Sequence, residues 1–166
     1  MTFLIDAFNV MYKLPETEEH MHKGELIAAR RGLLDLFRRL RKRRNKPLIL
    51  HAFFDGKKKP GDETRRESAG DLFLYYSQDL SADHLIKQFI IKSPSPGELH
   101  VVSSDKDIML FAKKHRCRPQ SSEDFIAWTR EILAPASDKK PEKEVNPRLS
   151  SGEVNEWLRL FRGGKK

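Results

Sequence analysis

Short apolar runs alternate with longer amphipathic stretches over residues 1–133. The apolar runs have the length of strands and comprise residues 3–5, 48–54, 72–76 and 99–102. The amphipathic stretches carry apolar residues at helical spacing and comprise residues 24–44, 81–91, 106–115 and 122–133. The second run is almost continuously apolar, as in a strand that is buried on both faces. This order predicts an α/β fold with a mainly parallel sheet covered by helices.

The composition changes after residue 133. Residues 134–148 are rich in Pro, Lys, Glu, Asp and Ser, which predicts a polar linker. Residues 149–166 combine a short amphipathic helix with a basic tail, and this helix either packs back on the domain or docks a partner. We therefore expect one folded domain over residues 1–133. Two further polar segments, residues 13–23 and 57–63, are expected to connect elements of that domain.

The chain is basic: 32 Lys and Arg residues against 24 Asp and Glu residues give its 166 residues a formal net charge of +8. Such an excess attracts polyanions, and nucleic acid is the commonest of them, although charge alone does not separate function from solubility. No apolar run has the length of a membrane span, and the N-terminal run is too short for a signal peptide. We therefore expect a cytoplasmic protein. The single cysteine, Cys117, cannot form an internal disulfide, which agrees with a reducing compartment.

Acidic residues follow three of the apolar runs. Asp6, Asp55 and Asp105 stand directly after or close to strand ends, and Asp83 begins a predicted helix. The ends of parallel strands meet at one edge of a sheet, which is where open α/β sheets bind ligands. Carboxylates gathered there repel one another unless a divalent cation is bound, and oxygen ligands favour Mg²⁺ or Mn²⁺. For each residue the alternative is that it only caps a helix or turn, and this holds equally for Asp107 in a first helical turn.

Other polar residues near these acids have two possible roles each. Asn9 either orients a metal-bound water or substrate, or ties down the loop after the first strand. Ser104 either binds a phosphate or caps a helix. The basic residues Lys57, Lys58, Lys59, Arg65 and Arg66 either grip an RNA backbone or form a solvated turn. The basic row at residues 38–44 is either an electrostatic track or the exposed end of a helix.

Four segments that carry these residues resemble a known family. Residues 4–10, 54–56, 81–86 and 101–105 occur in the order and approximate spacing of the NYN domain and are most similar to its YacP branch, within the PIN-like nucleases. The resemblance spans about residues 2–133. Two positions depart from the family pattern: Ala7 replaces the usual glycine, and Ser81 replaces a frequent threonine. Neither change removes a carboxylate.

The resemblance implies a PIN-like three-layer α/β/α sandwich and metal-dependent endoribonuclease activity. Asp6, Asp83, Asp105 and Asn9 match the family's functional positions, and Asp55 matches with less weight. We expect hydrolysis of RNA, single-stranded in the simplest case, to 5′-phosphate and 3′-hydroxyl ends by a metal-activated water. The alternative is a noncatalytic RNA-binding or ribosome-associated module. The RNA target, the number of ions and the oligomeric state stay open.

Overall fold

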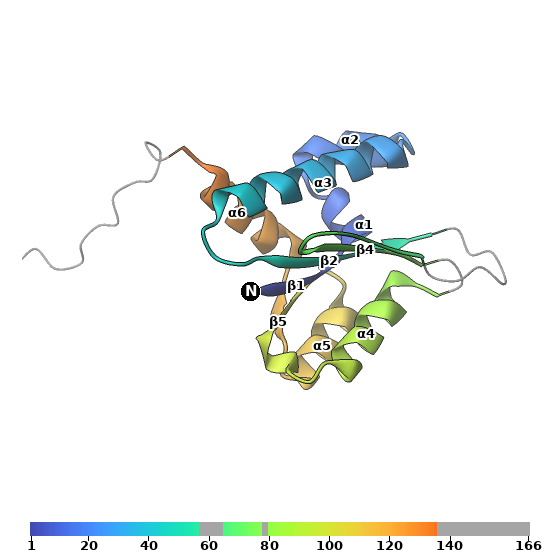
Figure 1. The fold of residues 1–166 in the computed structure, drawn as a ribbon. Coiled ribbons are helices and arrows are strands. Elements are labelled where there is room, and N and C mark those ends of the chain that lie inside the picture. Colours follow the sequence, from blue (N-terminus) through green and yellow to red (C-terminus); the bar gives the residue numbers. More distant parts are fainter. Residues whose placement is uncertain (57–64, 78–79, 136–166) are drawn as a thin grey trace, which may run out of the picture. The chain divides into compact units, whose positions relative to one another are not determined.

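A six-stranded sheet forms the centre of the computed structural model, which describes residues 1–56, 65–77 and 80–135 (Figure 1). Its strand order is β3-β4-β2-β1-β5-β6, and every neighbouring pair is parallel except β3 and β4. The strands are β1 (Thr2–Asp6), β2 (Ile49–Asp55), β3 (Arg65–Ala69), β4 (Leu72–Ser77), β5 (Leu99–Val102) and β6 (Arg118–Gln120). The predicted mainly parallel sheet is confirmed.

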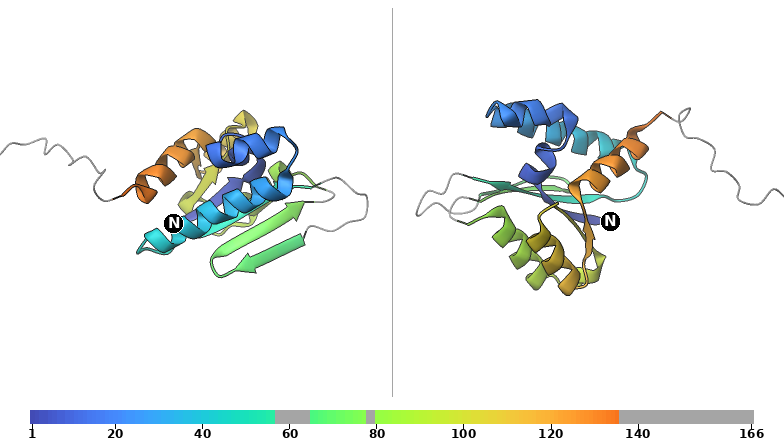
Figure 2. Two further views of the ribbon diagram at one scale, coloured as in Figure 1. Left: turned by 90° about the horizontal axis from the view of Figure 1, so that it is seen from above. Right: turned by 180° about the vertical axis from the view of Figure 1, so that it is seen from behind.

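Helices cover both faces of the sheet. They are α1 (Ala7–Met11), α2 (Pro15–His22), α3 (Leu26–Arg43), α4 (Ala82–Lys92), α5 (Lys106–Lys114) and α6 (Ser122–Leu133), with a 3-10 turn η1 (Pro96–Glu98) before β5. The first three and α6 lie on one face, whereas α4 and α5 lie on the other, as two further views show (Figure 2). This is the expected three-layer α/β/α sandwich.

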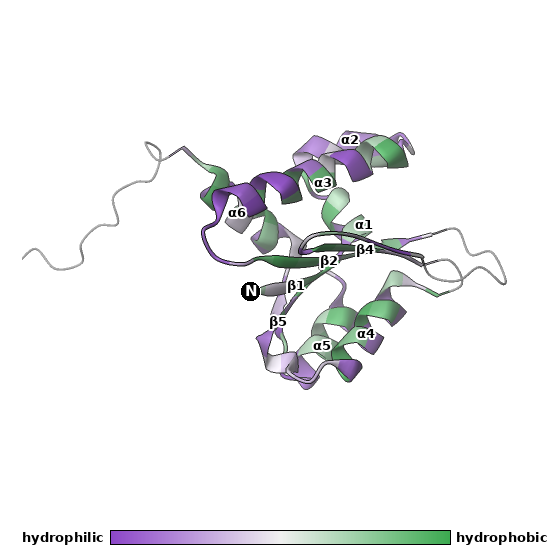
Figure 3. Cartoon of the chain, viewed as in Figure 1, coloured by the Kyte–Doolittle hydropathy of each residue, from purple (hydrophilic) through white to green (hydrophobic). Residues whose placement is uncertain are grey.

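Alternating side chains of the central strands build two hydrophobic cores, one on each face. Phe3 and Ile5 of β1 enter the core beneath α3 and α6, while Leu4 enters the core beneath α4 and α5. Phe54 and Phe53 of β2 divide in the same way, so both strands are buried on both faces. Figure 3 shows the central strands as hydrophobic and much of α3 as hydrophilic, because only one stripe of that helix faces the core.

Two elements occupy segments that the sequence pattern assigns to connections. Residues 15–22 form α2 rather than a polar loop; the helix buries only Thr17 and Met21, too few for a visible hydrophobic period. Thr17 Oγ1 donates to the Met11 carbonyl at 2.7 Å. A Cβ at Gly32 of α3 would lie 2.7 Å from Thr17 Cγ2, so this glycine lets the two helices approach closely.

The edge strands were also missed. Arg65 and Arg66 belong to β3, which pairs antiparallel with β4 through a turn at Gly70, whose φ is +61°. Strand β6 contains Pro119, which has no amide hydrogen and therefore suits an edge position. Exposed polar and charged residues dominate both strands, so neither shows the apolar pattern of a strand.

The predicted linker and C-terminal helix lie outside the described residues, apart from Ala134 and Pro135. They therefore stay predictions. Throughout the described part of the chain, helices lack the combination of length and apolar composition that a bilayer crossing requires.

Candidate active site

Asp6 occupies the carboxyl end of the central strand β1, where it is partly buried. Its Oδ1 accepts a hydrogen bond from the Asn9 amide at 3.3 Å, and its Oδ2 accepts one from Ser103 Oγ at 3.0 Å. Burial raises the pKa of this carboxyl group to about 6, and the two hydrogen bonds oppose the shift only in part. The charges of Asp55 and Asp105 raise the pKa further, so three strand-end acids influence one another at this edge of the sheet.

Ser103 links Asp6 to the turn that begins α5. The same Oγ that donates to Asp6 accepts a hydrogen bond from the Asp105 amide at 3.1 Å. Asp105 is the N-cap of α5: its Oδ1 accepts from the Asp107 amide at 2.8 Å and from the Ile108 amide at 3.3 Å. The capping role considered for Asp105 is therefore present, and its second carboxylate oxygen is not used in these bonds. Sequence reasoning missed Ser103, although its place directly after β5 is a usable signal.

Asp55 joins the end of β2 to the start of α4. Its Oδ1 accepts a hydrogen bond from the Ala82 amide at 2.7 Å. Ser81, the N-cap of this helix, accepts from the His84 amide at 3.1 Å, so the serine that replaces threonine keeps its capping function. Asp55 and Ser81 together satisfy two of the amides that a helix N-terminus leaves unpaired. The arrangement brings the first turn of α4, with Asp83, to the edge that carries Asp6.

Lys87 of α4 connects two further acids. Its Nζ lies 3.0 Å from Asp83 Oδ2 and also binds Asp107 Oδ2 of α5. These contacts raise the pKa of Lys87, chiefly through the hydrogen bond to Asp107 and then through that to Asp83. Asp83 Oδ1 is buried and has no hydrogen-bond partner among the described residues. The spacing of four between Asp83 and Lys87 was a readable signal, whereas the contact with Asp107 depends on the packing of two helices.

Asn9 and Ser104 take part in a polar network beneath the same edge. Asn9 Oδ1 accepts from the Ser104 amide at 3.0 Å and from Ser122 Oγ at 2.8 Å. Ser104 Oγ accepts from the Ser122 amide at 3.1 Å and donates to Glu123. Glu123 also forms an ion pair with Lys13, and the pKa of Glu123 falls to about 2, first because of Lys13 and then because of Ser104. The side-chain oxygen of Asn9 thus ties α1 to the loop after β5 and to α6.

The predicted RNA-binding residues divide into two groups. Lys57, Lys58 and Lys59 lie outside the described residues. Arg65 and Arg66 begin β3, and because β3 is antiparallel, its first residues pair with the last residues of β4 at the carboxyl edge. The Arg66 guanidinium stacks 4.9 Å from the centre of the Phe73 ring and 5.6 Å from that of Tyr75.

The carboxylates form two neighbouring groups, Asp6 with Asp55 and Asp105, and Asp83 with Asp107. Within residues 1–56, 65–77 and 80–135, no three Asp, Glu, His or Cys side chains are close enough to share a metal ion as they stand. Two observations nevertheless fit a divalent cation. The ionised form of Asp6 lacks sufficient compensation, and Asp83 Oδ1 has no hydrogen-bond partner in the part of the chain that the structure describes. Both are hard oxygen donors of the kind that Mg²⁺ and Mn²⁺ prefer.

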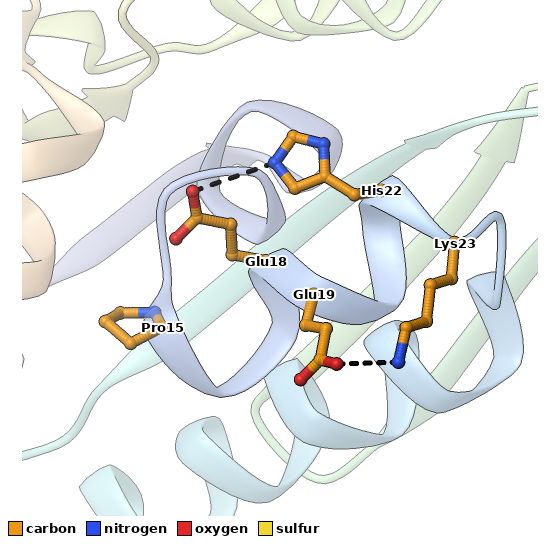
Figure 4. Close-up of a pocket in the computed structure, with 5 residues that line it drawn as sticks. All are labelled: Pro15, Glu18, Glu19, His22 and Lys23. Carbon is orange, nitrogen blue, oxygen red and sulfur yellow. Dashed lines mark hydrogen bonds and ion pairs between the residues drawn. The ribbon is translucent and has the colours of Figure 1, made fainter.

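His20 and His22 of α2 do not converge on a common point. His20 Nδ1 lies 2.6 Å from Glu25 Oε2, whereas His22 Nε2 lies 3.7 Å from Glu18 Oε1. Figure 4 shows His22 and Glu18 at a surface pocket that Lys23 and Glu19 also line. All the residues that line this pocket belong to α2 or directly adjoin it, so the pocket contains none of the strand-end acids.

Comparison with known proteins identifies the family. The model of the YacP-like NYN domain matches residues 3–162. A crystal structure of Rae1 (YacP) from Bacillus subtilis covers 99% of this chain and 95% of that chain at 16% identity, with a TM-score of 0.56. The crystal structure of a tryptophan-to-leucine mutant of the same protein covers 98% of this chain and 84% of that chain at 12% identity, with a TM-score of 0.62. No curated protein matches the chain.

The two solved structures share the fold, and the family model spans nearly the whole sequence, including the strand-end acids Asp6, Asp55 and Asp105. NYN domains belong to the superfamily of PIN-like nucleases. Membership of this superfamily suggests a nuclease-like function related to RNA. The chain belongs to the YacP-like NYN domain family.

Proposed function

We propose that this protein is a divalent-metal-dependent endoribonuclease that hydrolyses RNA phosphodiester bonds to 5′-phosphate and 3′-hydroxyl ends. The observation that carries the proposal is the state of Asp6. Its carboxylate is partly buried at the meeting point of strand ends, beside two other acids, with a pKa raised to about 6. Asp6 also caps α1 by accepting from the Asn9 amide, but capping leaves its buried charge poorly compensated, and a bound cation would offset that charge.

Asp6, Asp83 and Asp105 are the residues that would hold Mg²⁺ or Mn²⁺, with Asp55 and Asp107 as nearby acids. When bound, such an ion lowers the pKa of an attacking water and neutralises charge on the leaving oxygen. Ser103 orients the Asp6 carboxylate by its hydrogen bond, and Asn9 fixes the loop that carries Ser103 and Asp105 through the Ser104 amide. Asn9 is therefore proposed as a positioning residue of the site.

The RNA backbone would approach from the side of the carboxyl edge where β3 begins. Arg66 lies on that side, and Arg65 together with Lys57, Lys58 and Lys59 precedes or begins the same strand in sequence. Ser104 is less suited to a phosphate contact, because its hydroxyl group already donates to Glu123. The proposed substrate is single-stranded RNA, because a flexible strand can bend into an edge formed by loops and helix N-termini.

One specific observation favours the alternative, a noncatalytic RNA-binding module that could associate with ribosomes. Asp55 and Asp105 cap helices, and Asp83 and Asp107 bind Lys87. In a binding module these four acids would have only those structural roles. The two functions differ in whether the protein binds divalent cations and whether it cuts RNA.

The decisive experiment combines both measurements. Purified protein is incubated with end-labelled single-stranded RNA and Mn²⁺ or Mg²⁺, and divalent binding is measured by calorimetry. We expect cleavage with 3′-hydroxyl products, and a loss of at least about 100-fold in the Asp6→Asn variant. Asp71→Asn is the matched control, because Asp71 is an exposed acid next to the amino end of β4.

Three results would contradict the proposal. They are 2′,3′-cyclic product ends, equal activity in the Asp6→Asn and Asp71→Asn variants, and absence of divalent binding. The last result, combined with intact RNA binding, would establish the noncatalytic module instead.

A further inference from the structure

The C-terminal half of α3 carries a dense group of exposed cations. We call the following residues the α3 basic ridge: Arg38, Arg39, Lys42, Arg43 and, just beyond the helix, Lys46. The opposite side of the helix buries Leu36, Phe37 and Leu40, so the ridge follows the outer side. Asp35 neutralises part of this surface, through a 3.4 Å contact with Arg39.

Two other basic residues of this segment, Arg41 and Arg44, make contacts within the described part of the domain, whereas part of the ridge does not. Arg41 Nη1 donates to the Ala69 carbonyl at 3.2 Å, and the Arg44 guanidinium lies 5.4 Å from the centre of the Trp128 ring. Arg38 and Lys42, in contrast, make no ion pair, hydrogen bond or ring contact with the residues that the structure describes. Packing therefore explains Arg41 and Arg44 and leaves Arg38 and Lys42 unexplained.

Helix stability does not explain Arg38, and it favours Lys42 only through the helix dipole. Arg38 and Lys42 are four residues apart, and like charges at this spacing destabilise a helix by about 0.2–0.5 kcal/mol. The helix dipole favours cations only in the last turn, which contains Arg41, Lys42 and Arg43. Arg38 and Arg39 lie before that turn. An external anion is the partner that would offset the repulsion.

The ridge is far from the proposed site. Helix α3 has 18 residues, a length of about 27 Å, and it leads from the connection after β1 to the start of β2. Its last turn is therefore at the amino edge of the sheet, whereas Asp6 and Asp55 are at the carboxyl edge. The strand-end acids and the ridge thus lie at opposite edges of the sheet. Because carboxylates repel phosphates, affinity for RNA has to come from surfaces such as the ridge.

We propose that the α3 basic ridge is an RNA-docking surface that binds the phosphate backbone of double-helical RNA, at a distance from the cleavage edge. The inference takes RNA as the partner from the proposed function. Among the described residues, no exposed aromatic side chain lies on the ridge. The nearby ring of Trp128 is covered by the Arg44 guanidinium. The ridge therefore lacks the stacking groups typical of single-strand recognition and offers cations on a rigid helix, which suits a duplex backbone.

The test measures binding of an RNA hairpin by fluorescence anisotropy between 50 and 200 mM KCl, without divalent cations. Under these conditions binding does not depend on cleavage, so failure of this inference and failure of the nuclease proposal are distinguishable. In R38Q/K42Q we expect an affinity loss of about tenfold or more near 100 mM salt, and a log–log salt slope shallower by about 2. The matched control is K113Q/K114Q, which removes the same charge from exposed positions of α5.

Several outcomes would overturn the inference: unchanged affinity in R38Q/K42Q, an equal loss in K113Q/K114Q, or an equal loss for a single-stranded RNA of the same length. The inference would also be overturned if R38Q/K42Q lost binding to anionic lipid vesicles while its affinity for the hairpin stayed unchanged. Circular dichroism checks that the variants are folded. Lys46 lies outside the helix, so K46Q provides a second test with about half the change in salt slope.

Discussion

Ionisation of the partly buried Asp6 carboxyl group destabilises the folded protein. Its folded-state pKa of about 6 exceeds the reference value of 3.8, so the folded protein binds the proton more tightly than the unfolded chain does. The contribution of this group to stability is fully present below pH 3.8 and is lost as the pH rises through about 6. Above that pH, the wild-type protein carries a poorly compensated negative charge.

We therefore predict that Asp6→Asn stabilises the metal-free protein at pH 8, by up to about 3 kcal/mol, and much less at pH 4.5. The amide keeps the size of the carboxylate and can still accept and donate hydrogen bonds at Asn9 and Ser103. Urea denaturation at the two pH values in EDTA measures the difference in free energy of unfolding. A stability change that is the same at both pH values would show that folding does not raise the pKa of Asp6.

A cation at Asp6 competes with this proton. We predict that Mn²⁺ binds more tightly as the pH rises from 5 to 7 and that binding releases protons. Calorimetry at pH 6 in two buffers of different ionisation enthalpy measures that release. Binding that is independent of pH over this interval would mean that Asp6 is not among the ligands.

At the level of elements, α4 contributes both an acid and its counter-charge. Lys87 neutralises Asp83 and Asp107, so it reduces the attraction of the site for a cation. We predict that Lys87→Gln strengthens Mn²⁺ binding about fivefold, as expected for the loss of one repulsive charge in a partly exposed site. The control is Lys92→Gln in the last turn of the same helix. Equal affinities for the two variants would indicate that the ion binds away from Asp83.

The network around Asn9 joins three elements that are distant in sequence. Truncating Asn9 to Ala leaves the Ser104 amide without its acceptor, and we predict a destabilisation of about 1–3 kcal/mol. Because Asn9 also accepts from Ser122, the variants Asn9→Ala and Ser122→Ala should be non-additive by about 0.5–1.5 kcal/mol. A double-mutant cycle in urea tests this. Additive effects would show that the bond contributes nothing.

Burial determined which elements could be predicted. Strand β2 and helix α3 bury long apolar patterns, and both were found from the sequence within a residue or two at each end. Helix α2 buries two side chains, and β3 exists because it pairs with β4, which no local pattern records. The convergence of Asp6, Asp55 and Asp105 followed from strand ends. The bonds of Ser103 and Lys87 did not, because they depend on how neighbouring loops and helices pack.

At the level of the whole domain, the sheet separates two cores. Leu33 of α3 is buried in one core and Ile86 of α4 in the other, on opposite faces of the sheet. We predict that Leu33→Ala and Ile86→Ala each destabilise the fold by about 2–5 kcal/mol. Since the two residues belong to separate hydrophobic cores, their effects should add within about 0.5 kcal/mol in the double variant. Denaturant titration of the three variants checks this, and a larger deviation would reveal coupling through the sheet.

The composition of the two outer strands limits how copies of this chain can associate. Outer strands with free backbone groups invite another chain to extend the sheet, which leads to aggregation. Here one outer strand begins with Arg65, Arg66 and Glu67, and the other consists of Arg118, Pro119 and Gln120. Charge on the one and a missing amide hydrogen on the other oppose strand addition. Self-association through these two strands is therefore disfavoured, and concentrated samples should not form cross-β fibrils.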